Sequence, residues 1–219
     1  LRRKNIPYRV YGGLSFYQRK EIKDLVAYLR LLVNENDSEA LLRVINYPTR
    51  GIGETTQNKL IVFADSQNVS LANVLDNLGI YAPHLGFNNG VISKLADFWS
   101  MIKAFQVMLK TENVYTVAME VAQRSGLIKF LKDDQTPEGI SRVENVQELM
   151  NSMQGFIEEQ QQLEDGDPSL SSFLENIALS TDQDKKSENE DQVSLMTIHL
   201  SKGLEFPVVH LVGLEENLF

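Results

Sequence analysis

Residues 193–213 read VSLMTIHLSKGLEFPVVHLVG and differ in character from the chain before them. Two runs rich in β-branched residues, 193–199 and 208–213, predict strands, and the second is almost wholly apolar, as in a strand buried on both faces of a parallel sheet. The polar residues 197–206 follow the first predicted strand, and the carboxyl ends of parallel strands are where open α/β sheets place ligands. From spacing alone, an ordinary polar loop is the commoner explanation of such a cluster.

A third short strand is predicted near the other end of the chain, over residues 7–11, where polar and apolar residues alternate. The residues between are mostly helical in pattern, and apolar residues at i, i+3, i+4 and i+7 predict a helix over 20–33 with a charged, solvated opposite face. Similar spacing, with capping residues and Gly or Pro stops, predicts further helices at 39–46, from 54 onward, and at 71–78, 91–109, 114–124, 138–163 and 169–179. An α/β domain split in sequence by an inserted helical domain is the simplest topology that places strands at both ends.

The composition is that of an ordinary globular chain, with 219 residues, 42% hydrophobic and 23% charged. Cysteine is absent and the three histidines, His84, His199 and His210, are scattered, so disulfides, redox chemistry and zinc sites are not expected. No apolar run approaches the roughly 20 residues of a membrane span, and we expect a soluble, cytoplasmic protein with no membrane contact. Because Leu1 stands where an initiator methionine would, we expect a piece of a longer chain.

The net charge of −9 is unevenly distributed along the chain. Residues 1–60 hold eleven Lys and Arg against six Asp and Glu, whereas residues 61–219 hold ten against twenty-four. Because phosphate contacts supply most non-specific affinity for nucleic acid, the basic residues 1–60 are compatible with nucleic-acid binding. The acidic residues 61–219 favour another class of function, a helical module that binds a protein partner. Residues 181–192 contain no apolar residue and are predicted to be a solvated linker.

The sequence RGIG at residues 50–53 lies between two predicted helices. Glycines let backbone N–H groups approach a phosphate without an intervening Cβ, and the helix that follows would add its positive N-terminus. An ordinary turn between helices has the same pattern, because glycine turns are common. The pattern alone therefore leaves a phosphate site and a simple turn as alternatives.

Residues 193–219 resemble motif V of the UvrD/Rep/PcrA-type superfamily 1 DNA helicases nearly residue for residue. Residues 6–24, IPYRVYGGLSFYQRKEIKD, resemble motif IVa of the same family. The segments NYPTRGIG at 46–53 and RVENVQEL at 142–149 resemble further parts of it. The resemblance thus extends over essentially the whole chain, in the order of the family.

The resemblance implies a mainly α fold with a small α/β part. A helical domain, called 2B in this family, would be inserted into a truncated parallel-sheet motor domain, called 2A, of the RecA-like, P-loop NTPase-like type. Residues 1–36 would form the first part of 2A, 37–180 the 2B domain, 181–192 an acidic linker, and 193–219 the second part of 2A, truncated before motif VI.

The resemblance also assigns functional residues. In the motif V region it implies ATP contacts at Glu205 and Gly203, and single-strand DNA contacts at Thr197, His199 and Ser201. In the hairpin between the helices it implies duplex DNA contacts at Arg50, Gly51, Ile52, Gly53 and Thr55. Lys202 stays open between a phosphate contact and an ion pair, and Leu200 replaces the small residue usual in the family.

The function implied is that of an ATP-dependent DNA helicase that moves 3′ to 5′ on single-stranded DNA in repair or replication restart. Its partners would be 3′-tailed duplexes, single strands and repair proteins, and ATP and Mg²⁺ would belong to the intact enzyme. The 219 residues contain no G-x-x-x-x-G-K-[ST] sequence, so we expect this chain alone to hydrolyse no ATP. We also expect it to hold no cofactor or metal and to be a monomer. The alternative is a helical protein-interaction or regulatory module with little DNA binding of its own.

Overall fold

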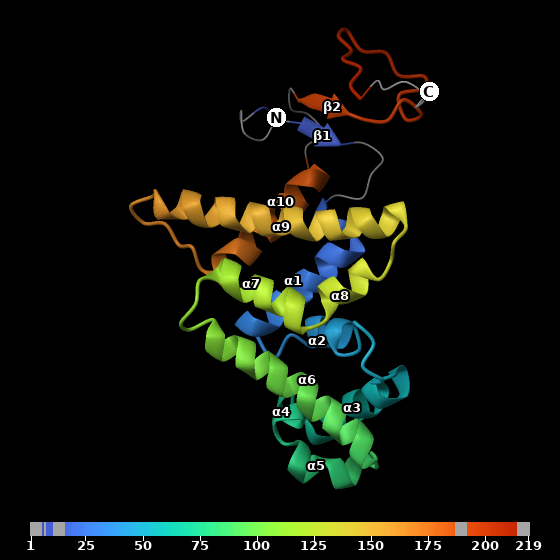
Figure 1. Cartoon of the computed structure of the whole chain (residues 1–219), viewed down its shortest axis with the longest axis vertical. Coiled ribbons are helices and arrows are strands. Elements are labelled where there is room, and N and C mark those ends of the chain that lie inside the picture. Colours follow the sequence, from blue (N-terminus) through green and yellow to red (C-terminus); the bar gives the residue numbers. More distant parts are fainter. Residues whose placement is uncertain (1–5, 7, 11–15, 187–191, 214–219) are drawn as a thin grey trace. The chain divides into compact units, whose positions relative to one another are not determined.

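The computed structural model describes residues 6, 8–10, 16–186 and 192–213. Contacts between residues divide the chain into two units, Phe16–Thr181 and a second unit that joins Leu1–Ser15 to Asp182–Phe219. The mainly α class is confirmed (Figure 1). The helices are η2 (a 3₁₀ helix, Phe16–Gln18), α1 (Lys20–Val33), α2 (Ser38–Val44), α3 (Glu54–Gln67), α4 (Leu71–Asp76), α5 (Leu78–Leu85), α6 (Asn89–Met108), α7 (Val114–Arg124), α8 (Leu127–Lys132), α9 (Pro137–Gln161) and α10 (Leu170–Lys186).

Helix α1 is the central helix of the unit Phe16–Thr181, because it contacts α2, α6, α7 and α9. Its predicted apolar stripe is buried, with Ile22, Leu25 and Leu29 fully inaccessible to solvent. Burying such side chains removes apolar area from water, which contributes about 1.5 to 3 kcal/mol for each. The bounds of α1 agree with the prediction at both ends.

The prediction that the opposite face of α1 is solvated is right for Lys20 and Lys23, which are exposed, and wrong for the two carboxylates beside them, which α2 and α9 cover. Asp24 is 2% exposed, and its Oδ1 lies 2.7 Å from a guanidinium nitrogen of Arg43 in α2. Glu21 is 5% exposed, and its Oε1 accepts a hydrogen bond from Nδ2 of Asn145 in α9 at 2.6 Å. Burial raises the pKa of Asp24, and the Arg43 guanidinium opposes that shift. Each buried carboxylate thus has one partner on a neighbouring helix.

Side-chain caps explain why several helix ends agree with the sequence signals. At the start of α7, Asn113 Oδ1 accepts a hydrogen bond from the backbone N–H of Thr116 at 2.8 Å. At the start of α4, Ser70 Oγ accepts a hydrogen bond from the backbone N–H of Asn73 at 3.2 Å. Helices α5 and α8 were not predicted. They have 8 and 6 residues, so neither shows much more than two turns of apolar spacing.

Helices α3, α4 and α5 form a smaller cluster that α6 joins to the rest of their unit. The three contact one another, and α6 contacts α4 and α5 as well as α1 and α7. Figure 1 shows α6 running from this cluster toward α7. None of the helices that the structure describes is both long enough and apolar enough to cross a membrane.

The second unit contains a two-stranded parallel sheet among its described residues. Strand β1 (Tyr8–Val10) pairs with β2 (Val193–Leu195), with Tyr8 opposite Val193 and Val10 opposite Leu195. The pairing brings together strands predicted at opposite ends of the sequence. A parallel pair requires a long connection between its strands, and here the connection contains the helices.

The prediction of a strand over residues 208–213 is wrong. These residues form no strand, and Val208 and Val212 are 71% and 84% exposed. A strand needs a neighbour for its backbone N–H and C=O groups, and the described residues provide only the β1–β2 pair. Helix α10 continues to Lys186 and so covers the first half of the predicted linker, whereas residues 187–191 lie outside the described part of the chain.

Candidate nucleic-acid interface

The hairpin between α2 and α3 is held in place by two side chains. Asn46 Oδ1 accepts hydrogen bonds from the backbone N–H groups of Arg50 at 2.9 Å and Ile52 at 3.0 Å. Ile52 is fully buried and anchors the hairpin in the core. Gly51 lies between them with φ +73°, in the left-handed region that glycine adopts without strain. Gly51 and Gly53 themselves are exposed.

The Arg50 side chain, predicted to contact duplex DNA, is half-buried and makes hydrogen bonds within the protein. Its Nη1 donates to the carbonyl oxygens of Val44 at 3.0 Å and Pro48 at 3.1 Å. Its Nη2 donates to the Ser125 carbonyl oxygen and the Tyr28 hydroxyl, both at 2.7 Å. The planar guanidinium satisfies carbonyl groups that helix ends and turns leave without partners. Arg50 therefore ties the hairpin to α1 and to the end of α7, and its donors are directed at groups of the protein.

The Tyr28 hydroxyl completes this buried network. It donates to the Tyr47 carbonyl oxygen at 2.6 Å while it accepts from Arg50. Burial raises the pKa of Tyr28 to about 12, with the nearby Arg50 charge acting in the opposite direction. The hydroxyl therefore remains protonated at neutral pH and keeps its role as a donor.

Lys94 of α6 adds a positive charge at the hairpin. A Cβ atom added at Gly51 would lie 2.5 Å from Lys94 Nζ, so the ammonium group lies directly over the hairpin glycine. Lys94 is exposed, and no carboxylate of the described residues forms an ion pair with it. Sequence reasoning missed Lys94 because it belongs to a distant helix, and nothing in the spacing of α6 distinguishes it from other solvated lysines.

The N-terminus of α3 follows the hairpin without a side-chain cap. Its N-cap residue is Gly53, with φ −72° and ψ 174°, and no side chain accepts from the first turn. The N–H groups in a first helical turn have no acceptor within the helix, so those of Glu54 and Thr55 remain open to an anion. Thr55 is exposed and adds a hydroxyl. Open N–H groups, the positive end of the helix dipole and Lys94 favour a phosphate oxygen here, whereas the exposed Glu54 carboxylate in the same turn opposes it.

The motif V residues lie on one tight turn of the second unit. The backbone N–H groups of Leu200 and Ser201 donate to the Thr197 carbonyl oxygen at 3.0 and 3.1 Å, and the Ser201 hydroxyl donates to the Ile198 carbonyl oxygen at 2.8 Å. Gly203 has φ +84°, a conformation that favours glycine.

The turn leaves most of the predicted ligand residues accessible. Thr197, His199, Gly203 and Glu205 are exposed, while Ser201 is half-buried and uses its hydroxyl within the turn. Lys202 is exposed as well. The loop thus collects a hydroxyl, an imidazole and a carboxylate on one accessible segment.

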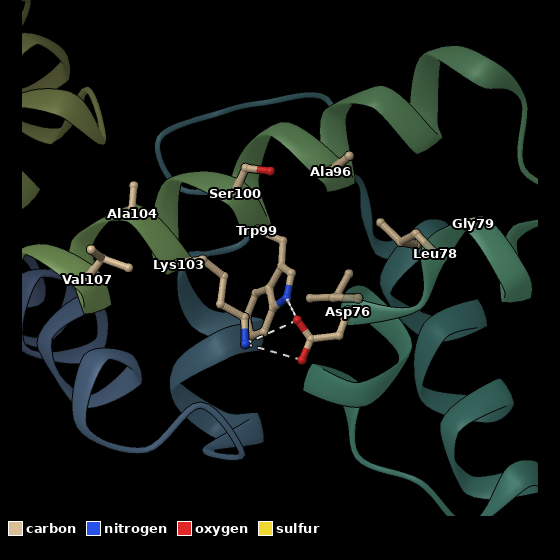
Figure 2. A pocket seen from close by; sticks show the side chains of 10 residues that line it. Asp76, Leu78, Gly79, Ala96, Trp99, Ser100, Lys103, Ala104 and Val107 are labelled. Carbon is tan, nitrogen blue, oxygen red and sulfur yellow. Dashed lines mark hydrogen bonds and ion pairs between the residues drawn. The ribbon is translucent and has the colours of Figure 1, made fainter.

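A hollow between α4, α5 and α6, about 610 Å³ in volume, is less suited to an anion (Figure 2). Figure 2 shows Trp99, Lys103 and Asp76 turned toward one another. Trp99 Nε1 donates to Asp76 Oδ1 at 2.6 Å, and Lys103 Nζ lies 3.1 Å from Asp76 Oδ1 and 2.7 Å from Glu35 Oε2. Both carboxylates neutralise the one ammonium group, so this cluster joins α6 to its neighbours and leaves no cation for a phosphate.

Comparison with known proteins identifies the family. The model of the UvrD-like helicase C-terminal domain matches residues 1–219. The ATP-dependent DNA helicase PcrA of Staphylococcus aureus strain Mu50 is 37% identical over 217 residues, and that of Staphylococcus epidermidis strain ATCC 12228 is 38% identical over the same length. These alignments cover 99% of this chain but only 29% of each relative. The chain therefore belongs to the UvrD-like helicase C-terminal domain family.

Proposed function

We propose that this chain supplies DNA contacts and one wall of the ATP site of an ATP-dependent DNA helicase. The observation that carries the proposal is the hairpin, where Lys94 Nζ lies over Gly51 beside the uncapped N-terminus of α3. Both PcrA relatives are ATP-dependent DNA helicases. By the same resemblance the intact enzyme moves 3′ to 5′ in repair or replication restart, and residues 37–180 are the 2B domain inserted into 2A.

In this proposal the hairpin binds the duplex ahead of the motor. The backbone N–H groups next to Gly53, the Thr55 hydroxyl and the Lys94 ammonium group contact phosphate oxygens. Arg50 and Ile52 take no part in those contacts and instead fix the hairpin. Phosphate contacts carry no sequence information, which suits an enzyme that must move along DNA of any sequence.

The motif V turn is proposed to contact two ligands. Thr197 and His199 donate to phosphate oxygens of the single strand, and the Glu205 carboxylate accepts from ribose hydroxyls of ATP beside Gly203. The exposure of these groups supports both contacts. The sequence has no G-x-x-x-x-G-K-[ST] phosphate cradle, and the proposed ATP contact of Glu205 is with the sugar of the nucleotide. One turn in contact with both ligands can couple the state of the nucleotide to the grip on DNA.

A salt titration tests the hairpin part of the proposal. In fluorescence anisotropy with a 3′-tailed duplex, we expect Lys94→Ala to weaken binding several-fold at low salt. We also expect it to reduce the slope of log K against log salt by about one, because one phosphate contact releases about one counterion. Lys132→Ala removes an exposed lysine of α8 and serves as the matched control. An unchanged slope for Lys94→Ala, or no binding of the unaltered chain at low salt, would favour the protein-interaction alternative.

A further inference from the structure

Helix α6 begins with the pair Asn89–Gly90, the one Asn–Gly step in the sequence. Asparagine is a chemically labile residue, because its side-chain amide carbon can be attacked by the backbone nitrogen of the next residue. A glycine at that next position favours the attack, since it has no Cβ and its backbone turns freely. Both residues are exposed, so water reaches the pair.

The two asparagines at the start of α6 differ in how they are held. Asn88 is the N-cap, and its Oδ1 accepts a hydrogen bond from the backbone N–H of Val91 at 2.9 Å. The side-chain amide of Asn89 has no hydrogen bond with any residue in the described part of the chain. Folding therefore fixes the Asn88 side chain and leaves that of Asn89 able to turn toward the Gly90 nitrogen.

The Gly90 nitrogen is accessible to that side chain. Gly90 is the second residue of α6, and the N–H groups of a first helical turn have no acceptor within the helix. Among residues 6, 8–10, 16–186 and 192–213, no group accepts a hydrogen bond from it. Helix ends fray, and opening α6 at Asn89 breaks only the Asn88 cap and the 3.1 Å bond from the Ile92 N–H to the Asn88 carbonyl oxygen.

The pair Asp165–Gly166, in the turn after α9, provides a contrast within the same chain. An aspartate before a glycine can undergo the same ring closure, with loss of water in place of ammonia. Here, however, the Gly166 N–H donates to the Leu163 carbonyl oxygen at 3.3 Å. A Cβ added at Gly166 would overlap the Gln160 carbonyl oxygen, so the site is also crowded. The structure thus favours reaction at Asn89–Gly90 over reaction at Asp165–Gly166.

We propose that Asn89–Gly90 is a site of spontaneous deamidation. The Gly90 nitrogen attacks Asn89 Cγ and forms a C–N bond, which closes a succinimide ring. The bond from Cγ to the side-chain nitrogen breaks, and that nitrogen leaves as ammonia with the proton from Gly90. Water then opens the ring at either carbonyl group and leaves aspartate or isoaspartate. Water is the only co-reactant, and no electron is transferred.

The reaction changes the charge and the geometry at the start of α6. It replaces a neutral amide by a carboxylate, so the net charge of −9 becomes one unit more negative. Isoaspartate also adds a methylene group to the backbone, which disrupts the cap that Asn88 makes. The new charge lies two residues after Phe87, whose ring centre is 5.7 Å from Lys59 Nζ, and on the helix that carries Lys94. A weaker grip on the duplex is therefore expected, and this consequence alone rests on the proposed function.

The test is to incubate the purified chain at neutral and at mildly alkaline pH and to map its peptides by mass spectrometry. Isoaspartate is detected with an isoaspartyl methyltransferase. Conversion is expected at Asn89, faster at the higher pH because the nitrogen attacks in its deprotonated form. Gly90→Ala should slow it about tenfold or more, as a barrier higher by about 1.4 kcal/mol does. Asn88→Ser, which keeps a capping side chain, is the matched control and should leave the rate unchanged.

The results separate this proposal from the proposed duplex contact. An Asn89 that stays intact in the folded chain, while the chain unfolded in urea converts, would overturn the deamidation proposal. Equal reaction at Asp165–Gly166, or an unchanged rate in Gly90→Ala, would overturn it as well. Asn89→Asp imitates the aspartyl product and is expected to weaken duplex binding. If Asn89 converts but neither Asn89→Asp nor Lys94→Ala affects duplex binding, the modification stands and the hairpin contact fails.

Discussion

Replacing Arg50 by alanine is expected to lower the free energy of unfolding by about 3 kcal/mol or more, since each buried acceptor left without a partner costs about 1 to 3 kcal/mol. Three acceptors lose their donor, on Pro48, Ser125 and Tyr28, whereas the Val44 carbonyl oxygen keeps the backbone N–H of Tyr47 at 3.0 Å. The guanidinium carbon also lies 5.4 Å from the centre of the Phe98 ring, a cation–π contact that alanine removes. Urea denaturation followed by circular dichroism measures the change.

The matched control for Arg50 is Arg142→Ala. Arg142 is an exposed arginine whose ion pair with Asp134 measures 3.3 Å, and such pairs contribute about 0 to 1 kcal/mol. Arg50→Lys should fall between the two, because an ammonium group has three donors and lacks the planar fork. A stable Arg50→Ala protein that had lost duplex binding would contradict this assignment and restore Arg50 as a DNA contact.

Replacing Gly53 by aspartate is expected to separate DNA binding from stability. The backbone at Gly53 has the extended conformation usual for an N-cap, and a Cβ there meets nothing within 4 Å. An aspartate can therefore cap α3 and should stabilise the chain by about 0.5 kcal/mol through the cap and the helix dipole. The same carboxylate occupies the N–H groups and repels phosphate. Duplex affinity should fall at least about tenfold, since a hydrogen bond to a charged group contributes about 1.5 to 3 kcal/mol.

Gly53→Ser is the control for Gly53→Asp. Serine caps the same N–H groups without adding a charge, so its loss of affinity should be smaller and its stability similar. Anisotropy and thermal unfolding on the same samples measure both effects. Unchanged duplex affinity in the more stable Gly53→Asp chain would show that the N-terminus of α3 does not bind the DNA backbone.

Local pattern predicted the long helices but not where every polar side chain points. The bounds of α1 and α7 follow from apolar spacing and caps, which are properties of neighbouring residues. The burial of Asp24 and the inward course of Arg50 depend on helices that pack from elsewhere in the chain. A single sequence with helical periodicity does not specify those contacts.

In the candidate site, too, some features follow from neighbouring residues and others depend on contacts with distant helices. Gly51 and Gly53 could be singled out from the sequence only because the resemblance to the helicase family favours a phosphate site over an ordinary turn. Lys94 could not, since its proximity to Gly51 arises only when α6 packs beside the hairpin. The apolar run 208–213 was assigned to a strand from composition, yet pairing depends on neighbours that the described residues do not supply.

The two hydrogen bonds to Asn46 Oδ1 also bear on the entropy of DNA binding. Ordering the backbone of one residue costs about 1 to 2 kcal/mol, and an unrestrained loop incurs that cost when its ligand arrives. Here Asn46, buried Ile52 and the Arg50 network order the hairpin during folding. The hairpin is therefore preorganised, and little of its interaction with a phosphate is offset by lost chain motion.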